Sequence, residues 1–343
     1  MSERNGQQKS LFKKVNCNYE ESLILSPGRR VEIVQYFKDA FHKENRKVYT
    51  LDMSDKAPAL YFGDEYFRID KDFAHLDLYI NKVLEICKKK EVGAIITLID
   101  PELVLLSHYK QEFDQLGVKL ILSNLDFVES TFDKFEFYNK YKGILKLVET
   151  VGSAEDALNK LNSKEWEFPL FAKLRDGSAS IGIKKINSFE DIEELKSEPK
   201  YIYQPFIAGK EYGVDTFFDL KSGKLVSMFI KEKLAMRAGE TDKAISVHSQ
   251  NVIDEVLKVQ NIKGLYGPID IDVFVSNDGE VYINEINPRF GGGYPHAYGC
   301  GVNFMNLILN NLNGNENQVS LDSYKEGIMM LKYNGLYFKD TND

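Results

Sequence analysis

Cysteine, histidine and tryptophan are scarce in this sequence, which has three, five and one of them among 343 residues. The cysteines, Cys17, Cys87 and Cys300, are far apart, and no CxxC pair indicates a zinc site or a redox dithiol. The histidines are not spaced as metal ligands and the GxSxG motif is absent, so little supports a hydrolase. A reducing, cytoplasmic setting is expected.

Long hydrophobic runs and an excess of positive charge are also lacking. No apolar run approaches the roughly 18–20 residues of a membrane span, and the N-terminal MSERNGQQKSLFKK has no apolar signal core. Lys and Arg number 44 against 52 Asp and Glu, and a net charge of −8 repels a polyphosphate backbone. We therefore expect neither membrane nor nucleic acid as partner, and a small anionic substrate would need a locally basic pocket.

The sequence does contain enough apolar residues, 43% of the chain with 12% aromatic, for two or three packed domains. The first is expected over residues 20–125, after a flexible lead-in of residues 1–19. Short apolar runs alternate there with segments of helical periodicity, a pattern typical of a parallel α/β sheet. The expected strands cover residues 21–26, 47–54, 92–100 and 118–124.

From residue 126 onward the pattern changes to strand candidates joined by turns. Residues 126–202 predict a small α+β unit, in which Ser188 as N-cap and Asp191 in the first turn begin a helix. Residues 203–312 predict a larger, mostly antiparallel α+β unit, and residues 313–343 a C-terminal tail packed on it.

The most informative segment, residues 267–289, reads GPIDIDVFVSNDGEVYINEINPR. Two strands joined by a turn place Asp272 opposite Glu285, and Asn287 lies two residues further on the same face. Two carboxylates and an amide oxygen suit Mg²⁺, which completes its shell with waters and phosphates. Arg289 follows, where its guanidinium would meet a metal-bound phosphate. The alternative interpretation is an ordinary acidic hairpin with its carboxylates in solvent.

Two further segments carry weaker signals. FPLFAKLRDGSASIGI, residues 168–183, places Lys173 at the end of an apolar strand before a Gly/Ser loop, which offers backbone N–H groups and a positive charge to a phosphate. A plain hairpin turn explains that loop equally well. In YQPFIAGKEYGVD, residues 203–215, an extended stretch could bind an adenine edge and Glu211 could accept from ribose hydroxyls, although structural hairpins contain such residues as often.

Taken in this order, the three segments resemble the ATP-grasp superfamily, and the resemblance spans residues 20–312. The strand–PGRR–helix opening, the strand end DMS and ITLIDPEL are similar to the N-terminal domain of its carbamoyl-phosphate-synthase-like branch. The resemblance implies an α/β fold class: a pre-ATP-grasp, Rossmann-like parallel sheet, followed by an ATP-grasp fold whose lid is the smaller α+β unit.

The resemblance also assigns roles to matching positions. ATP would be bound by Lys134, Lys173, Gly177, Ser178, Ser180, Gln204, Pro205, Phe206 and Glu211. Magnesium, with Mn²⁺ as a substitute, would be held by Asp272, Glu285 and Asn287, and the transferred phosphoryl group would be stabilised by Arg289 and Arg237. Two positions depart from the family pattern, since Gln204 stands where Glu is frequent and Asp272 where Glu or Gln is common.

The activity implied is ATP- and Mg²⁺-dependent ligation of a small carboxylate, such as an amino acid, to an amine. The acid would form an acyl phosphate, and ADP and phosphate would be released. The alternatives are an ATP-binding protein with a regulatory or assembly role and an enzyme that uses bicarbonate as its acid. A homodimer is the default expectation, and the sequence leaves the substrate pair open.

Two N-terminal segments have open interpretations. PGRR, residues 27–30, could hold an anion at the start of a helix or be an ordinary turn. Asp100 and Glu102 follow a parallel strand, at the sheet edge where open α/β sheets bind ligands, and could recognise an amine. N-capping of a helix by Asp100 ahead of Pro101 explains the same residues without a ligand.

Overall fold

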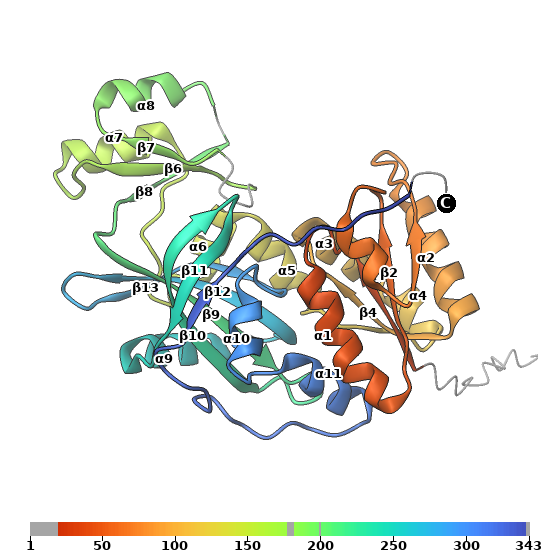
Figure 1. Cartoon of the computed structure of the whole chain (residues 1–343). Coiled ribbons are helices and arrows are strands. Elements are labelled where there is room, and N and C mark those ends of the chain that lie inside the picture. The colour runs from red at the N-terminus through yellow and green to blue at the C-terminus, as the bar shows by residue number, and fades with distance from the viewer. Residues whose placement is uncertain (1–19, 177–181, 199, 341–343) are drawn as a thin grey trace, which may run out of the picture.

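The computed structural model describes residues 20–176, 182–198 and 200–340. Figure 1 shows three units: an N-terminal parallel sheet, a small lid sheet, and a large six-stranded sheet between them. Three residues that were predicted to bind ATP lie outside the described residues, namely Gly177, Ser178 and Ser180. None of the helices in the described part of the chain has the length and apolar character that crossing a membrane requires.

The N-terminal unit is a parallel sheet with the strand order β3-β2-β1-β4-β5, which confirms the predicted fold class. Its strands are β1 (Glu21–Leu25), β2 (Val48–Asp52), β3 (Glu65–Arg68), β4 (Val92–Thr97) and β5 (Lys119–Leu120). Its helices are α1 (Val31–Phe41), α2 (Leu76–Lys90), α3 (Asp100–His108) and α4 (Lys110–Gln115), with 3₁₀ turns at His42–Glu44 and Pro58–Phe62.

The differences from the predicted elements have local causes. Strand β3 was missed because its sequence, EYFR, has no fully buried residue and hence no apolar pattern. Strand β5 is shorter than predicted because the chain leaves the sheet to contact the large unit. There Ser123 Oγ donates to the carbonyl of Tyr266, and the Asn124 N–H donates to the carbonyl of Gly264.

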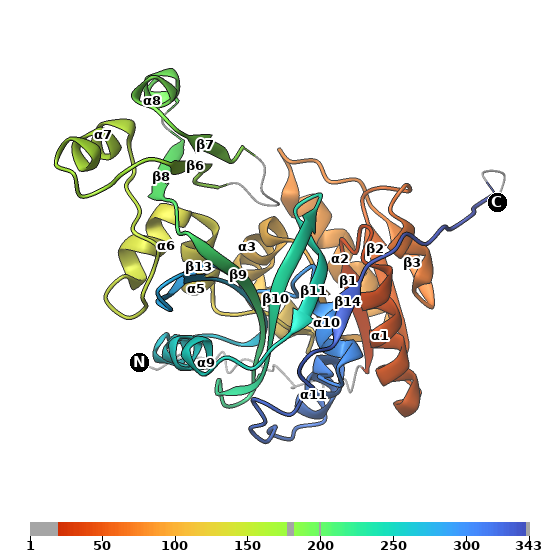
Figure 2. The same cartoon turned by 60° about the vertical axis from the view of Figure 1, so that its left-hand side comes forward.

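The lid is an antiparallel sheet with the order β7-β6-β8, covered on one side by two helices (Figure 2). Its elements are α7 (Ala154–Asn162), β6 (Leu170–Leu174), β7 (Lys184–Ile186), α8 (Phe189–Leu195) and β8 (Tyr201–Pro205). The predicted helix start is present, since the Ser188 side chain accepts from the Asp191 N–H and Asp191 accepts in return from the Ser188 N–H.

The lid's limits differ from the predicted range 126–202. Strand β8 pairs with β6, so a boundary after residue 202 would cut through a lid strand. Helices α5 (Leu125–Phe132) and α6 (Lys134–Tyr141) belong with the large unit instead, because Phe127 and Phe137 pack into its core.

The large unit is an antiparallel sheet with the order β13-β12-β9-β10-β11-β14. Its strands are β9 (Gly209–Phe218), β10 (Leu225–Arg237), β11 (Glu240–Ser246), β12 (Gly267–Ser276), β13 (Val281–Asn287) and β14 (Met329–Leu331). Its helices are α9 (Gln250–Leu257), α10 (Tyr294–Gly299) and α11 (Phe304–Leu312), with a 3₁₀ turn at Lys258–Asn261.

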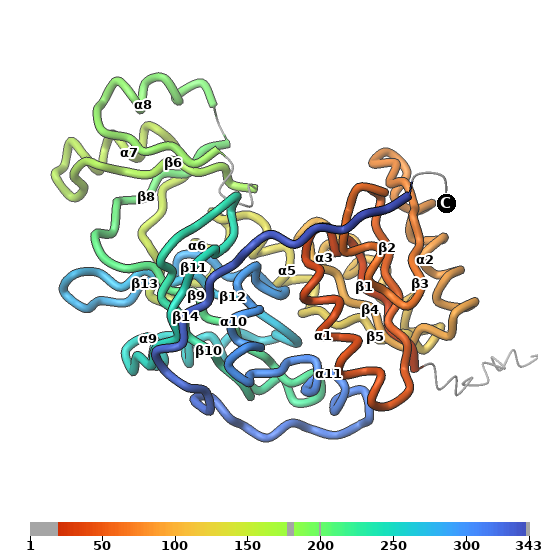
Figure 3. The backbone as a smooth tube through the Cα atoms, in the orientation of Figure 1, coloured from red at the N-terminus to blue at the C-terminus, as the bar shows by residue number. Residues whose placement is uncertain are grey.

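The two faces of this sheet pack differently. One face is apolar along its length and packs on α9, α5 and α6. The other face shares a core with α1, α10 and α11 through residues such as Phe217 and Phe229, and this core joins the N-terminal and large units. Beyond β14 the chain crosses back to the N-terminal unit, where Tyr337 stacks on Tyr61 with ring centroids 5.3 Å apart (Figure 3).

Candidate functional site

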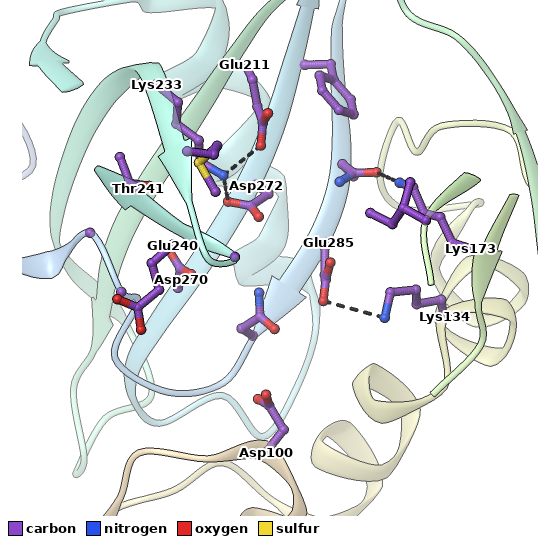
Figure 4. A pocket seen from close by; sticks show the side chains of 18 of the residues that line it. Asp100, Lys134, Lys173, Glu211, Lys233, Glu240, Thr241, Asp270, Asp272 and Glu285 are labelled. Atoms are coloured by element: carbon purple, nitrogen blue, oxygen red, sulfur yellow. Dashed lines mark hydrogen bonds and ion pairs between the residues drawn. The ribbon is translucent and has the colours of Figure 1, made fainter. Parts of the chain in front are cut away.

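A cavity of about 580 Å³ lies where the three units meet. The large sheet forms its floor, the lid covers one side, and the N-terminal unit contributes the segments around Arg30 and Asp100. Figure 4 shows charged side chains of both signs pointing into this space. Of the predicted site residues that the structure describes, the cavity is lined by Lys134, Lys173, Gln204, Pro205, Phe206, Glu211, Asp272, Glu285, Asn287 and Arg289.

Strand alternation explains why so many polar groups share one face of the large sheet. Successive side chains of a strand point to opposite faces, so every second residue shares a face. Residues paired across neighbouring strands then form a row on that face. The rows are Asn287–Asp270–Asp215, Glu285–Asp272–Gly213 and Phe274–Glu211. The residues between them in sequence, such as Val214 and Ile271, point into the apolar core on the other side.

The predicted metal ligands lie together in these rows. Asp272 on β12 is the direct partner of Glu285 on β13, as the hairpin arithmetic predicted, and Asn287 continues the same face. The described residues contain no cluster of three or more His, Cys, Asp or Glu side chains that could hold a metal alone. Two carboxylates and an amide oxygen nevertheless fit Mg²⁺, because nucleotide phosphates and waters usually complete its shell.

Lys233 is the central cation of the site and was not predicted from the sequence. Its ammonium donates to Asp272 at 2.6 Å and to Glu211 at 2.7 Å, and only 5% of its side chain is exposed. Burial alone would lower the pKa of Lys233, but the carboxylates of Asp272 and Glu211 outweigh it and raise the pKa. Counting from the turn at Asp219–Lys224 could not have found this contact, because the β9–β10 pairing shifts by one residue between Leu225 and Ser227.

Two lid-side lysines approach the same sheet from the opposite direction. Lys173 on β6 donates to Asn284 Oδ1 at 2.9 Å, and Lys134 at the start of α6 lies 3.7 Å from Glu285 Oε1. Burial lowers the pKa of Lys173 to about 8; the Glu285 carboxylate opposes this shift and the Lys134 ammonium adds to it. Three ammonium groups therefore surround the two carboxylates.

ATP affinity is expected to weaken as pH rises above about 8. In the free protein Lys173 loses its proton near pH 8, whereas a bound phosphate stabilises the ammonium and raises its pKa, so binding above this pH takes up a proton. Calorimetry should give a Kd that is flat below about pH 8 and rises above it, with an enthalpy that depends on the buffer. The Lys173→Arg variant keeps its charge and should lose this dependence; an unchanged profile would contradict the assignment.

The segment that was predicted to hold adenine lines the lid side of the cavity. The Gln204 amide nitrogen donates to Thr150 Oγ1 at 2.9 Å, so an adenine amino group would have to approach the amide oxygen. The Phe206 N–H donates to the carbonyl of Pro169 at 3.2 Å. This N–H is therefore engaged within the lid. The role of the Phe206 backbone in binding adenine stays a prediction, and the next residue, Ile207, also lines the cavity.

The rows that contain the predicted metal ligands, Asn287–Asp270–Asp215 and Glu285–Asp272–Gly213, are called the metal rows below. Arg289 lies at their far end and is held by Asp100 of the N-terminal unit. Its Nε and Nη2 atoms lie 3.1 and 3.2 Å from the two oxygens of Asp100, and Nη2 also donates to Asn287 Oδ1. Burial alone would lower the pKa of Arg289, but the carboxylates of Asp100 and Asp270 raise it. Asp270 itself lies 3.7 Å from Nη1, and burial together with Asp272 and Asp215 raises the pKa of Asp270 to about 7 against the effect of Lys231.

The structure shows the contacts made by the two N-terminal segments with open interpretations, Asp100 with Glu102 and PGRR at residues 27–30. Ile99, not Asp100, is the N-cap of α3, and Asp100 serves as the partner of Arg289. Glu102 is buried within the N-terminal unit, where Tyr79 donates to it at 2.7 Å. From PGRR, Arg30 donates to the carbonyls of Leu98 and Phe290 at 2.9 and 3.1 Å.

The structure does not bring Arg237 together with Arg289. Arg237 is the exposed last residue of β10, and the cavity lining contains its neighbours Met236 and Ala238 but not Arg237. Its role in phosphoryl transfer stays a prediction from sequence.

Comparison with known proteins agrees with this geometry. Residues 132–293 match the family model of the ATP-grasp domain, and residues 22–121 match that of the PylC-like N-terminal domain. The chain carries an ATP-grasp domain behind a PylC-like N-terminal domain. The superfamily predicted from the motifs is thereby confirmed, and the ATP-grasp match spans the lid and the metal rows.

Curated relatives are distant. The chain is 26% identical to the D-alanine–D-alanine ligase of Staphylococcus carnosus over 228 residues, which is 58% of this chain and 56% of that one. It is 25% identical to the tyramine–L-glutamate ligase of Methanocaldococcus jannaschii over 256 residues, 70% of this chain and 80% of the relative. The match thus spans little more than half of the D-alanine–D-alanine ligase.

Solved structures share the fold at low sequence identity. N5-carboxyaminoimidazole synthetase from Staphylococcus aureus superposes with a TM-score of 0.67 at 17% identity, covering 86% of this chain and 77% of that one. The biotin carboxylase domain of 2-oxoglutarate carboxylase from Hydrogenobacter thermophilus, solved with MgADP and bicarbonate, gives a TM-score of 0.71 at 15% identity, covering 90% and 73%. The shared fold thus extends over most of this chain and about three quarters of each of these two neighbours.

Proposed function

We propose that this ATP-grasp chain is an ATP- and Mg²⁺-dependent ligase that joins a small carboxylate, such as an amino acid, to an amine through an acyl phosphate. The observation that carries the proposal is the arrangement on the large sheet. The paired carboxylates Asp272 and Glu285 lie between three lysines in one cavity, which continues past Arg289 toward the N-terminal unit.

The charge pattern suits phosphoryl transfer, which depends on positioning and charge neutralisation more than on a covalent nucleophile. Lys134 and Lys173 would bind phosphate oxygens from the lid side, and Lys233 from the sheet side. Asp272, Glu285 and Asn287 would hold Mg²⁺, which when bound neutralises the phosphate charge. Mn²⁺ would substitute, because it accepts the same oxygen ligands.

The nucleotide base would lie between the lid and the large sheet. Phe171, Pro205 and Phe206 offer apolar surface there, and Phe171 and Phe206 lie 5.9 Å apart between ring centroids. Glu211 would accept from the ribose hydroxyls, and its carboxylate is oriented by Lys233 at 2.7 Å.

Arg289 would act on the reacting groups. A substrate carboxylate oxygen attacks the γ-phosphorus and ADP leaves. The neutral amine nitrogen then attacks the acyl carbon and displaces phosphate, which takes up the proton that the nitrogen loses. The transferred phosphoryl oxygens carry negative charge during the first step, and the departing phosphate gains negative charge in the second. The Arg289 guanidinium lies at the end of the metal rows, where it could stabilise that charge. Asp100 would act as a positioning residue, because it holds the guanidinium through two nitrogens.

The relatives support the reaction class. Two of the relatives are named as D-alanine–D-alanine ligase and tyramine–L-glutamate ligase, each of which joins a carboxylate to an amine. Neither the substrate pair nor an assembly is transferred from them, and the homodimer and the cytoplasmic location stay predictions.

The proposal is tested by an ADP-release screen of the full chain with ATP and Mg²⁺ over pairwise mixtures of amino acids, small carboxylates and amines. We expect one acid and one amine to raise ADP release well above the rate without substrate, together with a product in mass spectrometry. EDTA should abolish it. An ATP-binding protein with a regulatory role would bind MgATP but show no acid- and amine-dependent release with any pair, and this result would reject the ligase.

A further inference from the structure

The part of the cavity beyond Arg289, which we call the acceptor end, carries both signs of charge. Its charged residues come from five separate segments of the chain, and Figure 4 shows Glu240 and Asp270 on the side opposite Lys173. Its charged residues are Arg29, Arg30, Asp100, Glu240, Asp270 and Arg289.

Two of the three carboxylates at the acceptor end have close cationic partners. Asp100 pairs with Arg289 through two nitrogens, at 3.1 and 3.2 Å. Glu240 lies 3.3 Å from Lys332 and 3.4 Å from Arg29, with Arg30 at 3.6 Å. These two carboxylates are therefore neutralised within the protein.

Asp270 differs, because no donor in the described part of the chain hydrogen-bonds its side chain. Its nearest cation is Arg289, at 3.7 Å and turned toward Asp100. Lys231 below it is engaged by Asp215, in a pair that is almost fully buried. An ionised carboxylate has room for about four hydrogen bonds, and a largely buried one without donors is costly. With 14% of its side chain exposed toward the cavity, Asp270 can be satisfied only from there.

Close packing holds the Asp270 carboxylate in this position. A Cβ atom on Gly291 would lie 2.5 Å from it, so a larger residue there would require the Asp270 side chain or the backbone to shift. Gly292 likewise passes close to Glu240, with a Cβ at 2.6 Å. The GGG segment thus packs against both carboxylates and limits the space on its side of Asp270.

We propose that Asp270 binds a primary amino group of the substrate, which makes it a specificity-determining residue of the acceptor end. An ammonium group offers three hydrogen-bond donors and a positive charge, which the Asp270 carboxylate does not receive in a hydrogen bond from the described residues of the protein. Asp270 also lies one row from the proposed metal ligand Asp272, close to where the reaction would occur. The amino group is carried either by the acid, next to its reacting carboxylate, or by the incoming amine. In the second case the ammonium passes a proton to Asp270 before its nitrogen attacks. The inference rests on the proposed ligase function.

The two sources are separated by paired substrate panels on the wild-type chain with ATP and Mg²⁺. Hydroxylamine, uncharged near neutral pH, serves as a common nucleophile for alanine against propionate, glutamate against glutarate, and other amino acids against their des-amino acids. If the acid carries the bound amino group, kcat/KM should fall about tenfold or more for the des-amino acids. If the amine carries it, both acid panels should react equally, and ammonium-type amines should be preferred over hydroxylamine.

The Asp270→Asn variant tests the residue itself, with Asp278→Asn as the matched control. Asp278 lies exposed in the turn between β12 and β13, outside the cavity lining. We expect Asp270→Asn to raise KM for the amino-bearing substrate about tenfold to a hundredfold and to leave the KM for ATP near wild type. Asp278→Asn should change neither. An unchanged KM for both substrates in Asp270→Asn, or equal use of amino and des-amino compounds on both sides, overturns the inference.

Calorimetry separates this failure from failure of the ligase. The amino-acid panel is titrated into the wild-type chain in the presence of MgADP. Suppose that amino acids bind the wild-type chain, do not bind Asp270→Asn, and no pair of substrates releases ADP. The amino-group subsite would then stand and the ligase function would be rejected. Turnover with the unchanged KM described above would keep the ligase and reject the subsite, and absence of both binding and turnover would overturn both.

Discussion

Replacing Glu285 with Ala is expected to lower the Mg²⁺-dependent turnover rate about a thousandfold or more. Glu285 is the direct cross-strand partner of Asp272, so its loss removes one of two facing carboxylates and leaves Lys134 without the partner at 3.7 Å. The ADP-release rate measured against Mg²⁺ concentration is the readout. Higher Mg²⁺ should recover part of the rate, because Asp272 and Asn287 remain.

Glu280→Ala is the matched control for this variant. Glu280 precedes β13 in the same hairpin, is exposed, and lies outside the cavity lining. Its replacement should leave turnover near wild type. A Glu285→Ala chain that folds as judged by circular dichroism and retains full activity would exclude the proposed metal site.

Replacing Arg289 with Ala is expected to lower kcat about a hundredfold to a thousandfold while changing the Kd for ATP little. The guanidinium lies at the end of the metal rows, whereas the nucleotide side of the cavity is lined by the lid. It would therefore act on charge that develops during transfer. Single-turnover rates and nucleotide titration separate the two effects, and an equal loss of both would show that Arg289 only helps to dock the nucleotide.

Two other arginine variants sharpen this comparison. Arg68→Ala removes an exposed guanidinium that pairs with Asp70 in the N-terminal unit, and it should have no effect on kcat. Arg237→Ala tests the second arginine predicted from sequence. Because Arg237 is exposed outside the cavity lining, we expect a much smaller loss than for Arg289, and a comparable loss would restore its predicted role.

The features that could be predicted from sequence are those set by local geometry. The hairpin pattern predicts that Asp272 faces Glu285, and the structure pairs these two residues. The match depends on a one-residue shift between Asp272 and Val273, without which counting from the turn would pair Asp272 with Asn284. The same alternation, applied to IDID, would have put Asp270 on the face of Asp272. The contact between Lys233 and Glu211 was out of reach of this counting, because the β9–β10 pairing shifts by one residue next to the turn.

Contacts between distant segments could not be predicted in this way. Asp100 and Arg289 are 189 residues apart in sequence and come from different units, so their contact depends on how those units pack. The engaged N–H of Phe206 depends in the same way on the pairing of β8 with β6 in the lid. Hydrophobic periodicity specifies which face of a strand is buried but not which unit covers it.

The shared cavity has a consequence for how such a protein can change its chemistry. The nucleotide side is built entirely from residues after position 130, whereas the acceptor end borrows Arg29, Arg30 and Asp100 from the first hundred. The proposed acceptor end thus draws on both the first hundred residues and the large unit, whereas the proposed nucleotide side draws only on the later part of the sequence. Exchange of the N-terminal unit between relatives would alter the part of the acceptor end that contains Arg29, Arg30 and Asp100 and would leave Asp270 and the nucleotide side in place, provided that the counterpart of Asp100 still reaches Arg289.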